Sequence, residues 1–154
     1  MTDQKKVTVT LTIHAPLNMV WLAWTSPEDI KRWNIPSGDW RSPIVENNVC
    51  DGGKFFYRME KTDGTGGFDF TGTYGQVVKH KLISYTLNDG RGTVNEFAAV
   101  KQSTVITETF DTAPEPSVAE QEAFCAGVLN TFKQYVEDLL LNVTALDAVV
   151  MMLS

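Results

Sequence analysis

Apolar and polar residues alternate along residues 7–14, where positions 7, 9, 11 and 13 are apolar and positions 8, 10 and 12 are threonine. A period of two with β-branched side chains predicts a strand that buries one face. The segments 54–61, 67–78, 82–88, 91–100 and 104–111 are also predicted strands, joined by short turns such as Asp63-Gly64 and Asp89-Gly90. Strands at this spacing predict an antiparallel sheet.

Three other segments repeat their apolar residues with a helical period. Residues 17–24 place them at i, i+3, i+4 and i+7, which is one face of a short helix. Residues 27–33 open with a proline and two acids, as helix starts often do. From residue 118 onward, the steps of three and four predict a long amphipathic helix, with an apolar stripe formed by Cys125, Leu129, Phe132, Val136 and Leu139.

The order of these elements predicts an α+β fold, because strands and helices are segregated along the chain. We expect a curved antiparallel sheet of six or seven strands wrapped around the long C-terminal helix. Two short helices follow the first strand and close one end. Residues 34–53, which are rich in proline and glycine, are expected to form a loop with one short strand at most, around 40–47.

Composition and charge narrow the class of function. The chain has 154 residues, the length of one domain, and a net charge of −6, which disfavours nucleic acid as a partner. Its two cysteines are far apart, so neither a disulfide framework nor a cysteine zinc site is expected. We expect no cofactor and no metal. No membrane segment is expected either, because no apolar run reaches 18 residues. The first ten residues show no apolar signal region, so the expected location is cytoplasmic.

Several motifs carry a resemblance to a known family. They are Ala15-Pro16 with Trp21, Trp24 and Trp33 spaced behind it, Gly-Gly-Lys-Phe at 52–55, Thr-Glu-Thr-Phe-Asp at 107–111 and Tyr-Val-Glu at 135–137. The chain resembles the bacterial proteins similar to the activator of the heat-shock-protein-90 ATPase. These belong to the START-like (SRPBCC, birch-pollen-allergen-like) superfamily with the helix-grip fold. The resemblance covers about residues 7–138 and implies a single START-like domain over 1–138, with a chaperone as a partner by analogy only.

Three features depart from the family pattern. Ala123-Phe124 stands where similar proteins tend to have Gly-Trp, and Asn95 stands where an apolar strand residue is usual. Residues 139–154 form an apolar extension of the last helix that the family does not lead us to expect. This extension either folds back against its own sheet, packs on a second copy, or frays and aggregates. Because an exposed apolar patch of this size usually marks an interface, and two-fold dimers are the commonest assembly, we expect a homodimer that depends on residues 139–153.

The helix-grip arrangement implies a cavity between the sheet and the long helix. Alternation turns one aromatic face of the strands toward the helix, and three tryptophans are expected near the mouth. These side chains either fill a core or line a ligand pocket. The predicted lining residues are Trp24, Trp33, Trp40, Phe55, Tyr57, Met59, Phe68, Phe70, Tyr85, Phe97, Glu108, Phe110 and Phe124.

Glu108 is the most informative residue among them. It shares a strand face with Ile106 and Phe110, so its carboxyl group should point inward, where burial favours the neutral form. It is either a structural group or a polar anchor for a ligand, with Asn95 as a second candidate anchor. Its candidate hydrogen-bond donors are Arg58, Arg91, Tyr57, Tyr85 and the tryptophan indoles. Both histidines, His14 and His80, are expected to be exposed, so no catalytic triad can be assembled.

Three functions follow. The first is binding of a small hydrophobic or aromatic molecule without catalysis, for which we assign no catalytic residue. The alternatives are a co-chaperone-like adaptor that binds another protein, and an enzyme of cyclase or hydratase type that would use Glu108 and a tyrosine for proton transfer.

Overall fold

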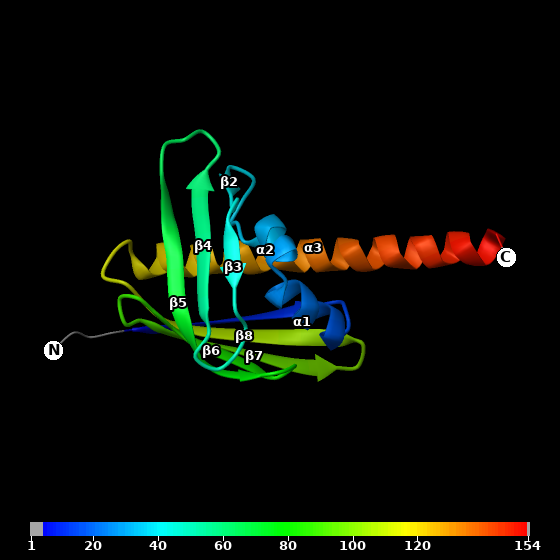
Figure 1. Cartoon of the computed structure of the whole chain (residues 1–154), viewed down its shortest axis with the longest axis horizontal. Helices are drawn as coiled ribbons and strands as arrows, with labels where there is room; N and C mark the ends of the chain where they lie inside the picture. The colour runs from blue at the N-terminus through cyan, green and yellow to red at the C-terminus, as the bar shows by residue number, and fades with distance from the viewer. Residues whose placement is uncertain (1–4, 154) are drawn as a thin grey trace.

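The computed structural model describes residues 5–153 and has one antiparallel sheet packed against a long helix (Figure 1). Elements follow the chain in this order: β1 (Lys6–Ile13), α1 (Leu17–Thr25), α2 (Pro27–Trp33), β2 (Trp40–Arg41), β3 (Val45–Asn47), β4 (Lys54–Lys61), β5 (Gly67–Val78), β6 (Leu82–Leu87), β7 (Gly92–Val100), β8 (Ser103–Asp111) and α3 (Val118–Leu153). The helix-grip α+β fold expected from the sequence is therefore confirmed.

The sheet has eight strands in the order β1-β8-β7-β6-β5-β4-β2, and β3 also pairs with β4. The count exceeds the expected six or seven because residues 34–53 contribute two short strands, β2 and β3, rather than one. Both are only two or three residues long, which is too short for an alternating pattern to reveal.

The sheet bends sharply within β5. The pairing of β5 with β6 shifts register between Tyr74 and Val77, and such a bulge increases local twist and bends a strand. Figure 1 shows the result: β4 and β5 run across the direction of β1, β7 and β8. At Gly72 a Cβ atom would lie 2.7 Å from the Thr86 carbonyl oxygen and 2.8 Å from the Phe55 ring, so glycine permits this close approach.

The core lies where α1, α2 and α3 meet the sheet. Trp24 stacks on Trp33 with ring centroids 5.0 Å apart, and the edge of the buried Phe132 ring faces both indoles. The Trp33 indole N–H donates to the Ala23 carbonyl at 2.9 Å, which meets the need of a buried indole for a partner. These contacts fix the two short helices against the middle of α3.

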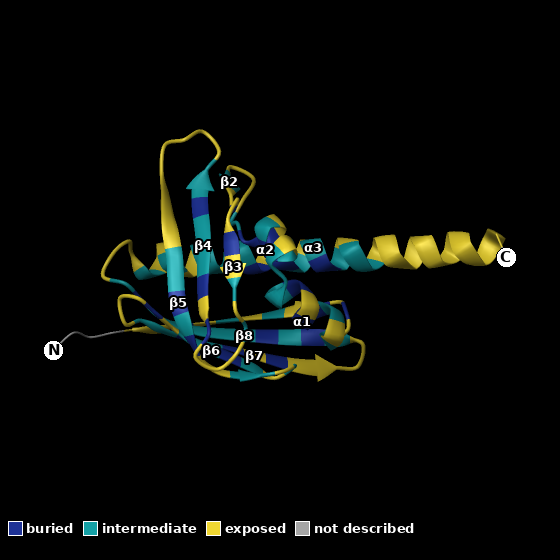
Figure 2. Ribbon diagram, viewed as in Figure 1, coloured by how far each residue is buried: buried dark blue, intermediate teal, exposed yellow. Residues whose placement is uncertain are grey.

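Helix α3 begins after Ser117, whose hydroxyl accepts a hydrogen bond from the Glu120 backbone N–H at 3.2 Å, as an N-cap does. The helix buries Leu129, Phe132 and Val136, and Phe132 packs on Trp24 and Trp33 of the two short helices. It then continues for about four turns beyond the body, and Figure 2 shows these turns as exposed. None of the helices within residues 5–153 combines the length and the hydropathy that crossing a bilayer requires.

One expected exposure was wrong. His14 is exposed, as expected, but His80 is only half-exposed. Its ring packs edge-on to Trp21 with centroids 5.8 Å apart, because the turn after β5 folds back over α1 with His80 at a φ of 67°. The Nδ1 atom of His14 lies 3.4 Å from the Ser103 hydroxyl oxygen, and the nearby Glu137 carboxylate accepts a hydrogen bond from the His14 backbone N–H rather than from its ring.

Candidate functional site

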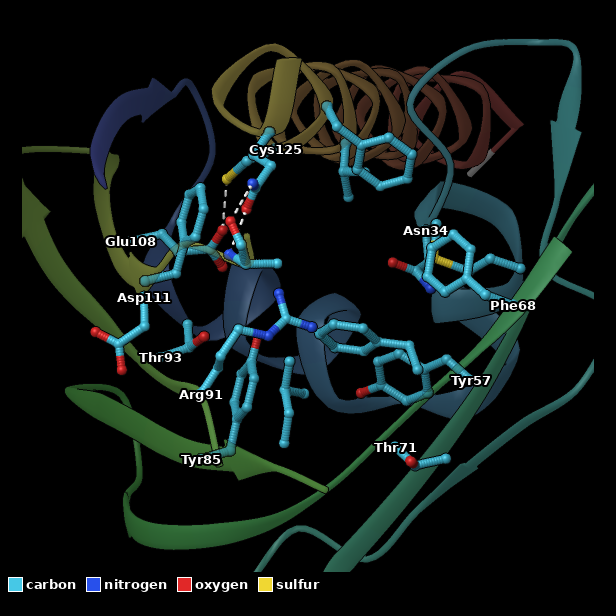
Figure 3. Close-up of a pocket in the computed structure, with 18 of the residues that line it drawn as sticks. Asn34, Tyr57, Phe68, Thr71, Tyr85, Arg91, Thr93, Glu108, Asp111 and Cys125 are labelled. Atoms are coloured by element: carbon cyan, nitrogen blue, oxygen red, sulfur yellow. Dashed lines mark hydrogen bonds between the residues drawn. The ribbon is translucent and has the colours of Figure 1, made fainter. Parts of the chain in front are cut away.

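A cavity of about 720 Å³ lies between the inner face of the sheet and the first half of α3 (Figure 3). This volume falls within the range of small-molecule sites, about 300–1,000 Å³. Eleven of the thirteen predicted lining residues surround it: Trp24, Trp33, Phe55, Tyr57, Met59, Phe68, Phe70, Tyr85, Glu108, Phe110 and Phe124. The strand alternation explains why they converge, since β4, β5, β6 and β8 each turn every second residue toward α3.

Two predicted residues do not line the cavity. Phe97 is buried, and its ring faces the edges of Trp21 and Trp24 at centroid distances of 5.2 and 5.4 Å. It lies on the inner face of β7, but that part of the strand is covered by α1. Trp40 lies behind the lining rings of Phe68 and Phe124, at 5.9 and 5.7 Å.

The carboxyl group of Glu108 points into the cavity and accepts a hydrogen bond from the Cys125 thiol at 2.6 Å (Figure 3). Glu108 is half-buried, and its side chain forms part of the cavity lining. Burial raises the pKa of Glu108, and the hydrogen bond from the thiol offsets only part of that rise. The pKa of Cys125 is raised as well, first by burial and then by the negative charge of Glu108. Both shifts favour the protonated acid and the protonated thiol more than water would for the same groups.

The sequence suggested Asn95 as a second polar anchor in the cavity, but the structure places it outside the lining. It lies on β7 directly across from Glu108 on β8, but it is 1% exposed and is not among the lining residues. Its Oδ1 atom is buried without a hydrogen-bond partner within the described part of the chain. A buried oxygen without a hydrogen-bond partner costs free energy. The strand beside Glu108 therefore carries a buried polar group that lacks a hydrogen-bond donor.

Tyrosine hydroxyl groups form a second polar cluster in the wall. The Tyr74 hydroxyl donates to Asn47 Oδ1, and the Tyr57 hydroxyl lies 3.5 Å from that of Tyr74. Burial raises the pKa of Tyr57 well above its usual value, and Tyr74 adds to the rise. The pKa of Tyr85 is also raised, by burial first and then by the charge of Glu108. All three phenols are therefore neutral hydrogen-bonding groups near neutral pH.

Acidic side chains dominate the charged part of the lining. Arg91 is the only basic residue among the described residues that line the cavity, whereas six lining residues are acids: Asp69, Asp89, Glu108, Asp111, Glu115 and Glu120. Figure 3 shows the Arg91 side chain extended into the cavity between Tyr85 and Tyr57. Its Nε atom donates to Asp89 Oδ2 at 2.8 Å, so one carboxylate already compensates the guanidinium charge. Glu108 receives no hydrogen bond from Arg91 among those observed, contrary to the candidate donor role.

The sequence missed the pairing of Cys125 with Glu108. Cys125 falls on the apolar stripe of α3, and the pattern indicated a core-filling thiol. The register that brings it to Glu108 depends on how α3 slides along β8, which the sequence does not encode locally. Within residues 5–153, no cluster of three or more histidine, cysteine, aspartate or glutamate side chains could hold a metal ion.

The architecture defines the class of this protein. A curved antiparallel sheet that grips a long C-terminal helix around an internal cavity is the START-like, helix-grip domain. Residues 14–137 match the family model described as "Activator of Hsp90 ATPase homolog 1-like protein". The match covers most of the chain, and the chain therefore belongs to this family.

Solved structures agree with this assignment. An AHSA1-like protein from Aeromonas hydrophila is 36% identical, with a TM-score of 0.82 over 88% of this chain and 94% of that one. A protein from Cytophaga hutchinsonii is also 36% identical, with a TM-score of 0.75 and the same coverage. A protein from Nitrosomonas europaea shares the fold at 17% identity, with a TM-score of 0.76 over 90% of this chain and 97% of that one. No curated protein matches the sequence.

Proposed function

We propose that this START-like domain binds a small hydrophobic or aromatic molecule in the cavity between the sheet and α3, without catalysis. The observation that carries the proposal is the cavity itself: about 720 Å³, walled by aromatic side chains, with a few convergent polar groups at Glu108, Cys125 and Arg91. An apolar pocket with few polar groups is the usual form of a small-molecule site. The aromatic walls supply area, and the polar groups orient the ligand.

The charges of the lining narrow the class of ligand to neutral or cationic molecules. Three of the six acids that line the cavity are paired with cations: Asp69 with Arg58, Asp89 with Arg91 and Asp111 with Lys6. Burial raises the pKa of a fourth, Glu108, and the remaining two, Glu115 and Glu120, leave the lining acidic. An anionic ligand such as a fatty acid would meet net repulsion, since like charges in a partly enclosed site interact strongly. A neutral or cationic aromatic molecule avoids this repulsion, and the faces of Trp24, Tyr57 and Tyr85 offer a cation favourable electrostatics.

Binding is favoured over catalysis because Glu108 lacks a second acid–base group. General acid–base chemistry needs groups whose pKa values lie near the working pH. Burial raises the pKa values of Tyr57, Tyr85 and Cys125 further above neutral pH. A chaperone partner is the alternative that the family name supports, and the cytoplasmic location expected from the sequence suits either role.

Calorimetric titration with three naphthalene probes tests the proposal. The probes are 2-naphthol, 2-naphthylmethylammonium and 2-naphthoate, which are similar in size and differ in charge. We expect saturable binding of one molecule per chain for the first two, and at least tenfold weaker binding of the third. Failure of all three to bind an intact fold refutes the ligand-binding function. Tighter binding of the carboxylate than of the other two refutes only the charge argument.

A pair of matched variants locates the binding. Val128 lines the cavity on α3, whereas Val100 is 51% exposed at the end of β7 and does not line it. We expect Val128→Trp to weaken binding of 2-naphthol about tenfold by narrowing the cavity, and Val100→Trp to leave it unchanged. Equal effects of the two substitutions would place the probe elsewhere.

A further inference from the structure

The buried stripe of α3 continues without a break into the exposed C-terminal extension, residues 139–153. Within the body the stripe consists of Leu129, Phe132 and Val136, all at most 2% exposed. Steps of three and four then lead to five more apolar residues, which we call the apolar seam: Leu139, Val143, Leu146, Val150 and Leu153. The last four of these residues are 41% to 83% exposed. Alternating steps of three and four with apolar residues at each are the signature of a helix that packs on another helix.

The chemistry of the extension selects a second copy of this chain as the occupant. Helices that lie on membranes carry lysine and arginine on a polar face, whereas the extension contains no basic residue and one acid, Asp147. The residues just before it, Glu137 and Asp138, are also acidic. Anionic lipid surfaces are therefore disfavoured. A second copy offers an identical seam of leucine and valine, and two-fold pairs are the commonest closed assembly.

The sheet and the short helices beside α3 restrict the direction in which a second helix can pair with the seam. The seam drifts by only about 20° per heptad relative to the stripe, so Leu146 points within about 40° of Phe132. Phe132 faces Trp24 and Trp33, and this side of α3 is therefore the one that the body occupies. In a parallel pair, residues 118–138 of the second helix would run beside this helix on that side and collide with the sheet. Figure 1 shows that the extension projects beyond one end of the body. In an antiparallel pair only the two extensions would therefore overlap, and the two bodies would lie at opposite ends.

We propose that two copies of this protein associate through their C-terminal extensions as an antiparallel helix pair. The register that matches the seams places Leu139 opposite Val150 of the second copy and Val143 opposite its Leu146, with the two-fold axis between residues 144 and 145. Leu153 then reaches the level of Val136 in the second copy, at the end of its body. At that end α1 and the tip of β7 carry the exposed apolar side chains Leu22 and Val100.

The mass of the full chain in solution is the first test. One chain has a mass of 17.1 kDa, and light scattering at 10–50 micromolar, a concentration range of the order used for such assays, should give twice that value. We expect Leu146→Glu to weaken association at least 100-fold. The matched control is Leu141→Glu, since Leu141 is 67% exposed but lies on the opposite side of the helix from the seam. A monomeric full chain, or equal effects of the two substitutions, overturns the proposal, as does a monomer that binds phosphatidylcholine vesicles.

Cysteine cross-linking tests the direction. In a background with Cys50→Ser and Cys125→Ala, single cysteines replace Leu146 or Leu153. In the antiparallel register the two copies of position 146 are about 4.5 Å apart along the axis and the two copies of position 153 about 25 Å apart, from a rise of about 1.5 Å per residue. We expect rapid disulfide formation for Leu146→Cys and none for Leu153→Cys. Cross-linking at position 153 would indicate a parallel pair and overturn the assignment of direction.

Discussion

The buried carboxyl group of Glu108 predicts a specific dependence of stability on pH. Its pKa in the folded protein is raised by burial above the ordinary value of 4.5. Below pH 4.5 the group is protonated in both the folded and the unfolded chain and costs nothing. As the pH rises through this value, the unfolded chain releases the proton while the folded protein keeps it, so unfolding becomes more favourable. The stability associated with the neutral acid is therefore lost progressively between pH 4.5 and the raised pKa.

The magnitude follows from proton linkage. One proton held only by the folded state changes the free energy of unfolding by about 1.4 kcal/mol per pH unit. Glu108→Gln replaces the neutral acid with a neutral amide of the same shape and removes this dependence. Between pH 4.5 and the raised pKa of Glu108, we expect the stability of the variant relative to the wild type to increase by at most about 1.4 kcal/mol per pH unit, and to level off above that pKa. For a chain of this length that corresponds to about 3–6 °C in Tm per pH unit.

Urea unfolding of both proteins at intervals between pH 4 and pH 8 measures the difference directly. Carboxylates with lowered pKa values, such as Glu60 and Asp111, lose their stabilising effect as the pH falls, but they are present in both proteins and cancel. Glu96→Gln is the matched control, because Glu96 is exposed on the adjacent strand, and its difference from the wild type should stay nearly flat. A flat difference for Glu108→Gln would refute the reasoning and indicate an ionised, hydrated Glu108.

Three further predictions concern packing and reactivity. Phe132→Ala should lower the free energy of unfolding by about 3–5 kcal/mol in urea titrations, since Phe132 is fully buried; a loss below about 1 kcal/mol would mean that the core collapses around the gap. Gly127→Ala should destabilise the protein, because a Cβ atom would lie 2.8 Å from the Pro36 carbonyl oxygen. This clash should outweigh the helix propensity of alanine, which favours it over glycine by about 1 kcal/mol. A rise in Tm would contradict this. A thiol reagent at pH 8 should modify the exposed Cys50 quickly and Cys125 slowly, because the raised pKa of Cys125 leaves little thiolate; equal rates would show that the cavity thiol is ionised.

The sequence determined the elements and the inward-facing side chains, because both follow from local periodicity. Alternation along residues 54–61 and 104–111 is enough to say which residues share a face, whatever the sheet pairs with. The stripe from Cys125 to Leu139 likewise predicts the long helix. For the same reason, eleven of the thirteen predicted lining residues lie around one cavity, although their role in binding stays a prediction.

Only the tertiary structure decided which of those inward faces meets open space and which meets another element. Phe97 and Glu108 both point inward from neighbouring strands, but α1 covers Phe97, whereas Glu108 faces the cavity and Cys125. The bulge after Tyr74 sets the bend of the sheet, and the position of α3 along β8 sets the thiol–carboxyl contact. Contacts between residues far apart in sequence depend on how whole elements pack, and the sequence around either residue does not encode that packing.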